Sequence, residues 1–212
     1  MGISMNVSIH HILTDDSRYP PALKTSSLFE SPHRLSFLGN FDILQPSLLG
    51  MFCSVRCPGD LVLKTYDVAQ HLRDSGATVI SGFHTPMEKE AFDVLMRGDQ
   101  PIVVCPARSL NRMRVPVTWR SKIQSGQMLV LSPFEDRHMR VTAALSELRN
   151  RFVATLAQDV LVVHANPNGK TAVLAQDVIA AGKIVYTLES DANAHLIAVG
   201  AKVLRLDEVG KL

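Results

Sequence analysis

Short apolar runs alternate with longer segments of mixed polarity from about residue 48 to the end of the chain. The runs are almost continuously apolar, which is typical of parallel strands that are covered on both faces. The pattern therefore predicts strands at residues 49–54, 78–81, 101–105, 128–131, 160–164 and 183–188, and a short last strand near residues 202–206.

The segments between these runs show the period of an amphipathic helix. In the first of them Leu61, Val68 and Leu72 fall on one face, and Gly76 follows where a C-cap glycine belongs. We expect helices at residues 60–75, 87–97, 117–125, 139–156 and 171–181. This alternation predicts an α/β fold, with a doubly wound, mostly parallel sheet and helices on both faces.

Residues 1–45 lack this alternation and are rich in Ser, Pro and Asp, with several turn signals. We expect an irregular N-terminal arm, with a short strand near residues 35–38. The arm is expected to pack on a Rossmann-like core domain formed by residues 46–212.

The composition restricts the function. The chain has 212 residues, of which 46% are hydrophobic and 20% are charged, and these are values of a globular protein. A net charge of +2 is too small to indicate a nucleic-acid binder by itself, so a polyanion site requires local clusters of Lys and Arg. The first residues show no secretory signal and no long apolar run spans a membrane, so we expect a cytoplasmic protein without a membrane partner.

The cysteines Cys53, Cys57 and Cys105 are odd in number and lie near predicted strands, so we interpret them as reduced thiols. A zinc site that joins the first two to His71 or His84 is disfavoured, because no second closely spaced ligand pair exists. No metal and no other cofactor is expected.

Ligands of doubly wound folds bind beyond the carboxyl ends of the strands. The first such loop contains Ser54 and Arg56, a hydroxyl and a cation at a helix start that suit a phosphate. Its glycines do not match G-x-G-x-x-G, which disfavours nicotinamide and flavin. The last loop contains Gly169-Lys170-Thr171 without the first glycine of a P-loop, so it suits a single phosphate and not a nucleoside triphosphate.

Residues 106–122 form the densest positive segment, without an acidic residue and with the single tryptophan, Trp119. Cations interleaved with an aromatic side chain suit phosphate contact combined with base stacking. The alternative is a solvated basic loop with the tryptophan packed on the sheet. The cations of this segment are Arg108, Arg112, Arg114, Arg120 and Lys122.

Two other segments have both a functional and a structural interpretation. Ser81-Gly82 ends the second predicted core strand, and Glu88 in the next helix is favoured there by the helix dipole alone. Arg149-Asn150-Arg151 suits anion binding or bracing of a helix. Because the run precedes a predicted strand, we expect it at the amino side of that strand, opposite the crevice, although its helix could carry one Arg toward the pocket rim.

The chain resembles the DNA-processing protein A (DprA, or Smf) family over about residues 18–204. Segment 149–165, RNRFVATLAQDVLVVHA, matches the family's R-N-R-I-I-A-G-L-S…V-L-V-V-E-A run, with His164 in place of the acid. Weaker matches in the same order are Cys53-Ser54-Val55-Arg56 at the family's G-S-R turn, Ser81-Gly82…Ala91-Phe92 at S-G-x-A-x-G-I-D-x-x-A-H with Glu88 for Asp and Phe92 for His, and Asn193…Gly200-Ala201 at N-x-L-I-x-x-G-A.

The resemblance implies an extended Rossmann-like core that binds single-stranded DNA in a basic pocket, forms a homodimer and loads a RecA-type recombinase. It implies a non-catalytic role in DNA processing, recombination or uptake, with Arg56 on phosphate. The residues expected to contact DNA or phosphate are Ser54, Arg56, Ser81, Gly82, Arg112, Arg114, Lys122, Asn168, Gly169, Lys170 and Thr171, while Arg149, Asn150 and Arg151 are expected to brace the fold or line the pocket rim.

Two other function classes stay open at this point. The first is a nucleotide-sensing Rossmann module that signals to a partner protein, for instance in a defence setting. The second is an enzyme that resembles the cytokinin-activating phosphoribohydrolases. Their P-G-G-x-G-T-x-x-E loop requires a carboxylate near Leu174, where this sequence has none, so enzymatic activity is disfavoured.

Overall fold

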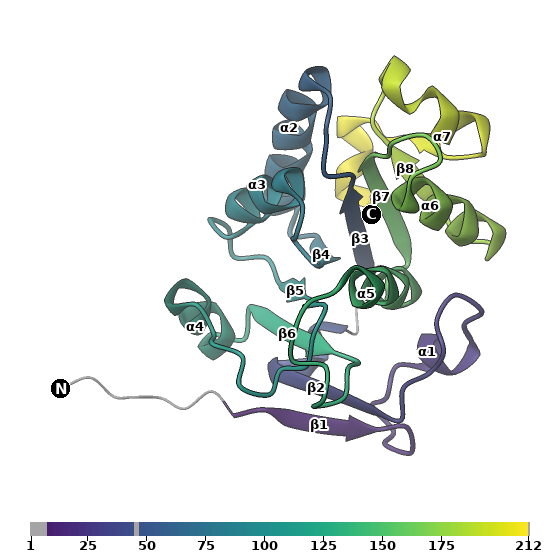
Figure 1. Ribbon diagram of the computed structural model, residues 1–212. Coiled ribbons are helices and arrows are strands. Elements are labelled where there is room, and N and C mark those ends of the chain that lie inside the picture. The colour runs from purple at the N-terminus through teal and green to yellow at the C-terminus, as the bar shows by residue number, and fades with distance from the viewer. Residues whose placement is uncertain (1–7, 45–46, 212) are drawn as a thin grey trace.

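The computed structural model describes residues 8–44 and 47–211, which form one mixed sheet with helices on both faces (Figure 1). The strands are β1 His10–Leu13, β2 Arg34–Gly39, β3 Leu48–Cys53, β4 Thr78–Ser81, β5 Ile102–Val104, β6 Met128–Ser132, β7 Asp159–His164, β8 Val185–Thr187 and β9 Lys202–Val203. The helices are α1 Pro21–Thr25, α2 Gly59–Ser75, α3 Pro86–Leu95, α4 Val117–Gln124, α5 Ala143–Leu156, α6 Lys170–Ala180 and α7 Ala194–Ala198, with short 3-10 turns at Phe41–Leu44, Asp191–Asn193 and Leu206–Lys211.

The strand order is β1-β2-β6-β5-β4-β3-β7-β8-β9, and the strands from β6 to β9 in this order are all parallel. The chain starts its parallel part at β3, builds outward to β6, and then returns to place β7 on the other side of β3. The point where the strand order reverses therefore lies between β3 and β7, where such folds bind ligands. The predicted doubly wound α/β fold is confirmed.

Two apolar clusters cover the faces of the sheet. One contains side chains from α1, α5 and α6, and the other contains side chains from α2, α3 and α4. The predicted C-cap is confirmed at Gly76, which has a φ of 79° and ends α2 in the left-handed conformation. The end of α5 is capped by a lysine, because Lys183 Nζ donates to the carbonyl oxygens of Ala154, Thr155 and Ala157 at 2.6–2.8 Å.

The N-terminal part is more regular than expected. Strand β2 pairs antiparallel with β6, and β1 pairs antiparallel with β2, so both extend the main sheet. Strand β1 has one buried side chain, Ile12, which explains why no apolar run announces it. The boundary that we placed at residue 45 lies outside the described residues, and the division into arm and core stays a prediction. Residues 1–7, in which we found no secretory signal, also lie outside the described residues.

None of the helices in residues 8–44 and 47–211 combines the length and the hydropathy that a membrane span requires.

Candidate functional site

The switch point carries two loops that are joined by hydrogen bonds. Ser54 follows β3, and its backbone N–H donates to the carbonyl oxygen of His164 at the end of β7 (2.8 Å). In return, the backbone N–H of Asn166 donates to Ser54 Oγ (3.0 Å). Because Oγ accepts this bond, the hydroxyl hydrogen of Ser54 is left for another acceptor. These two bonds join Ser54 to the loop after β7 at the switch point, and we call the region between the two loops the crevice.

Donors and cations surround this crevice. Arg56 is exposed two residues after Ser54, and it forms no ion pair within the described part of the chain. Helix α6 begins after Gly169 without a side-chain cap, so its first backbone N–H groups have no partner from the N-cap residue. Asn168 precedes it with a φ of 60°, which turns the loop sharply. The structure therefore places the loop of Ser54 and Arg56 beside the loop and helix start formed by Asn168, Gly169, Lys170 and Thr171.

Lys170 does not present a free charge. Its Nζ lies 2.8 Å from Glu147 Oε2 on α5, although both side chains are about half exposed or more. A carboxylate at this position neutralises a cation of the crevice and repels phosphate. No local sequence pattern predicts this contact, because the two residues lie on different helices.

Ser81 and Gly82 occupy the end of β4, where both contact other parts of the protein. Ser81 is fully buried, its hydroxyl donates to the carbonyl oxygen of Met51 (2.7 Å), and it accepts from the backbone of Phe83 (3.2 Å). Gly82 is covered by the guanidinium of Arg149. The expected phosphate contact of Ser81 is therefore replaced by contacts within the protein, while that of Gly82 stays a prediction.

Glu88 holds the backbone beside the crevice. Its carboxylate accepts from the backbone N–H of Cys53 at 3.0 Å, His84 at 2.8 Å and Thr85 at 3.3 Å. With Thr85 it forms a capping box at the start of α3, and Glu88 is 4% exposed. The sequence signal was the T-x-x-E spacing, and the helix dipole explains only part of what this residue does.

Arg149 lies at the carboxyl ends of the strands, so the expectation that it lies on the opposite side is wrong. Its Nη1 donates to the carbonyl oxygen of Cys105 after β5 (3.0 Å), and it is 4% exposed. The reason is that α5 runs back across the sheet and its first half lies near the crevice. Burial lowers the pKa of Arg149, and the nearby Glu88 carboxylate opposes this shift. The expected bracing role agrees with these contacts.

Asn150 and Arg151 line a cavity of about 230 Å³ between α5 and α6, together with His84 and Lys170. Asn150 Oδ1 accepts from Arg149 Nε (2.7 Å), and Arg151 pairs with Asp177 at 2.5 Å. The cations at this rim are thus largely neutralised by acids of the same chain.

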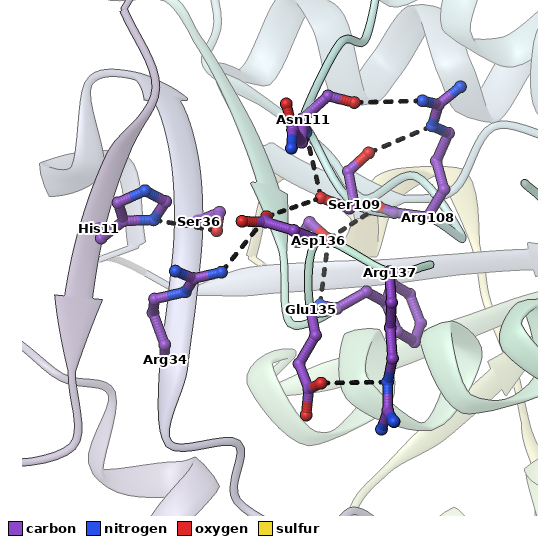
Figure 2. Close-up of polar contacts among 11 residues, drawn as sticks. His11, Arg34, Ser36, Arg108, Ser109, Asn111, Glu135, Asp136 and Arg137 are labelled. Carbon is purple, nitrogen blue, oxygen red and sulfur yellow. Dashed lines mark hydrogen bonds and ion pairs between the residues drawn. The ribbon is translucent and has the colours of Figure 1, made fainter. Parts of the chain in front are cut away.

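The basic loop after β5 is held in a defined shape (Figure 2). Arg108 donates to the carbonyl oxygens of Ser109 and Asn111, and Ser109 Oγ donates to Asp136 in the loop after β6. Asp136 also pairs with Arg34 of β2 at 3.3 Å, so the N-terminal hairpin supports the same network. Arg108 is consequently a structural cation of this loop.

Arg112 and Arg114 lie in the same loop and are exposed, without an ion pair in the described residues. They remain available for an anion at the carboxyl side of β5. Lys122 is not close to them, because α4 runs back toward the start of β6. There its Nζ donates to the carbonyl oxygen of Gly98, which lies before β5 at the amino ends of the strands.

Trp119 packs on the core in an edge-to-face contact with Phe92, with ring centroids 5.6 Å apart. Of the two interpretations of this tryptophan, the packed one agrees with the structure.

In the described residues no group of three His, Cys, Asp or Glu side chains is placed to hold a metal ion. Burial raises the pKa of the Cys57 thiol beside the crevice.

Comparison with known proteins identifies the family. The family model of DNA recombination-mediator protein A matches residues 10–209, nearly the whole chain. The chain belongs to the DNA recombination-mediator protein A family. The resemblance found in the sequence motifs is confirmed. No match was found among curated protein sequences.

Solved structures of the DNA recombination-mediator protein A family have the same fold. DNA processing protein A from Streptococcus pneumoniae gives a TM-score of 0.77 at 20% identity, over 92% of this chain and 71% of that one. The protein from Helicobacter pylori gives 0.76 at 18% identity, over 96% and 94%. The molybdenum cofactor carrier protein from Chlamydomonas reinhardtii gives 0.51 at 10% identity, over 78% and 94%. At such identities the likeness shows the fold and not the ligand.

Proposed function

We propose that this protein binds single-stranded DNA without catalysing a reaction, through the switch-point crevice and the basic loop after β5. The observation that carries the proposal is the hydrogen bond from the Asn166 N–H to Ser54 Oγ, which joins two loops into one anion seat beside the free Arg56. Family membership supports the choice of ligand. The Helicobacter pylori relative is described as having a unique single-stranded DNA binding mode.

The chemistry of the crevice suits a phosphodiester. A serine hydroxyl, uncapped N–H groups at a helix start and an unpaired guanidinium are all donors to phosphate oxygens. Arg112 and Arg114 add unpaired cations after β5. The backbone of a single-stranded DNA could therefore run along the carboxyl ends of the parallel β-strands. Phosphate contacts of this kind give affinity without reading sequence.

The cavity that adjoins the crevice at Lys170 is small for a free nucleotide. Pockets for small ligands usually measure about 300–1,000 Å³. The cavity between α5 and α6 measures about 230 Å³, which suits one phosphate or one base of a longer ligand. The alternative, a nucleotide-sensing module, requires a mononucleotide to bind as tightly as an oligonucleotide of the same base.

The test is fluorescence anisotropy of a labelled oligothymidylate at a series of salt concentrations. We expect Arg56→Ala to weaken binding roughly tenfold and to reduce the slope of log K against log salt by about 0.7, as for one lost phosphate contact on a single strand. Arg97→Ala is the matched control, because Arg97 is exposed between α3 and β5 at the opposite edge. Salt-independent binding, or equal effects of the two substitutions, would refute the proposal.

We further propose a homodimer as the binding unit and a RecA-type recombinase as its protein partner, on the strength of family membership alone. Sedimentation velocity tests the first, and co-purification with a purified recombinase tests the second. A protein that stays monomeric at all concentrations, or shows no recombinase contact with or without DNA, would rule out the respective partner.

A further inference from the structure

The floor of the crevice contains a buried histidine that the proposed function does not use. His164 ends β7 and is 4% exposed. Both ring nitrogens have a partner: Nδ1 lies 3.0 Å from Asn193 Oδ1, and Nε2 lies 3.4 Å from Asn166 Oδ1. The first partner is buried, while the second belongs to the exposed loop that forms the anion seat.

Asn193 determines which nitrogen of the ring carries the hydrogen. Its Nδ2 donates to the carbonyl oxygens of Val163 (2.9 Å) and Leu188 (3.0 Å). Carbonyl oxygens only accept, so the amide has one possible orientation and its Oδ1 faces the ring. Nδ1 of His164 must therefore be the donor. A neutral ring then has its lone pair on Nε2, which faces Asn166.

The orientation of the Asn166 side-chain amide depends on whether Nε2 of His164 carries a hydrogen. Its backbone is fixed, because its N–H donates to Ser54 Oγ and its carbonyl oxygen accepts from Gly169, so only the side chain can turn. Against a neutral ring, Nδ2 faces Nε2 and the amide oxygen is left toward the crevice. Against a protonated ring, Oδ1 accepts from Nε2, as the structure has it, and the NH₂ group is left for a ligand.

We infer that His164 is a positioning residue whose protonation turns Asn166 from a phosphate-repelling acceptor into a phosphate donor, so that anion binding takes up one proton. This inference rests on the proposed function of the crevice. Protonation of the ring also adds a positive charge beside Asn166.

In the part of the chain that the structure describes, no carboxylate pairs with His164. The titratable and charged side chains on the elements around it are Cys53, Arg56, Cys57, Asp60, Glu88, Lys170, Glu189, Asp191 and His195. A pH-dependent effect must therefore be assigned by substitution of His164 itself.

The hydrogen position is tested without any ligand. Long-range ¹H–¹⁵N spectra of ¹⁵N-histidine-labelled protein distinguish the two neutral tautomers. We expect His164, assigned from its absence in His164→Gln, to be the Nδ1–H form at high pH and to gain a second hydrogen on titration. A neutral Nε2–H form would overturn the inference.

The coupling is tested by oligothymidylate affinity between about pH 8 and about pH 5.5. One proton taken up permits at most about tenfold per pH unit, and we expect the wild type to gain roughly three- to tenfold in total more than His164→Gln, whose amide does not titrate. Asn166→Ala changes an exposed side chain only, so it tests the coupling even if His164→Gln does not fold. We expect it to lose most of the pH-dependent gain.

The control is His71→Gln, an exposed histidine on α2 away from the crevice, which should keep the wild-type pH profile. Equal pH profiles in the wild type, His164→Gln and Asn166→Ala would overturn the inference while DNA binding stands. Absence of oligonucleotide binding by the wild type at every pH would instead refute the proposed function.

Discussion

A Cβ atom on Gly82 would lie 1.2 Å from Nη1 of Arg149. The guanidinium therefore occupies the space that any side chain after β4 would require. From there it donates to the carbonyl oxygen of Cys105 after β5, so one buried cation packs on the end of β4 and is hydrogen-bonded to the end of β5. The glycine and the arginine are 67 residues apart in sequence (149 − 82) and act as one structural unit.

The first prediction follows from this contact. Gly82→Ala should destabilise the protein by about 2–4 kcal/mol, because the methyl group must displace a buried, hydrogen-bonded cation. Urea unfolding followed by circular dichroism measures the change. Gly59→Ala is the matched control, because no atom lies within 4 Å of its added Cβ in the first turn of α2, and it should be neutral or slightly stabilising. Equal midpoints for the two variants would contradict the packing described here.

The second prediction concerns Glu88, the buried acceptor of three backbone N–H groups. Glu88→Gln replaces one acceptor oxygen by a donor that faces other donors, and it removes the negative charge near Arg149. We expect a loss of about 2–4 kcal/mol in the free energy of unfolding. Asp93→Asn removes a charge from an exposed position of the same helix and should change it by less than about 0.5 kcal/mol. If Glu88→Gln lowered the free energy of unfolding no more than Asp93→Asn does, the three hydrogen bonds would contribute little to stability.

The sequence predicted the parallel core well because burial on both faces leaves continuous apolar runs. Strand β7 is an example, since every residue from Val160 to His164 is buried. Strand β1 escaped prediction because it is an edge strand with one buried side chain, Ile12. Its pairing with β2 is set by contacts that are distant in sequence, and no local pattern reports them.

The site was harder to predict than the fold because charge alone does not say where a cation points. Arg149 follows Leu145 by four residues and precedes Phe152 by three, so it shares the buried face of α5, and this spacing was the available signal. Lys122 was grouped with Arg112 and Arg114 by sequence distance, yet it lies in the last turn of α4, which carries it to the amino end of β5. The tie between His164 and Asn193 joins two segments that only the folded chain brings together.

The third prediction concerns the thiols. Burial raises the pKa of Cys105 to about 12, so at pH 8 only about one molecule in ten thousand carries its thiolate. Burial also raises the pKa of the Cys53 thiol strongly. The Cys57 thiol is half-buried, and burial raises its pKa as well. Iodoacetamide should therefore label native protein slowly and at Cys57 first. The labelling rate should increase with pH, because the fraction of reactive thiolate grows as the pH rises toward the raised pKa of the thiol.

Peptide mass mapping after timed labelling measures the order of reaction. Protein unfolded in urea supplies the comparison, and there all three cysteines should react at similar rates. Labelling of Cys105 as fast as Cys57 in the native state would mean that the loop after β5 opens far more often than its hydrogen bonds to the loop after β6 imply.

The last prediction links the crevice to its own acidic neighbour. The pair between Lys170 and Glu147 is exposed, so it adds little to the free energy of unfolding, but its carboxylate competes with phosphate for the lysine. If the crevice binds DNA as proposed, Glu147→Gln should tighten oligothymidylate binding roughly three- to tenfold and steepen the salt slope by about 0.7, because one more cation is freed for phosphate. Asp74→Asn releases Arg73 from a comparable pair at the far end of α2 and should leave affinity unchanged. Tighter binding in both variants would indicate a general charge effect, and no change in Glu147→Gln would place the strand away from Lys170.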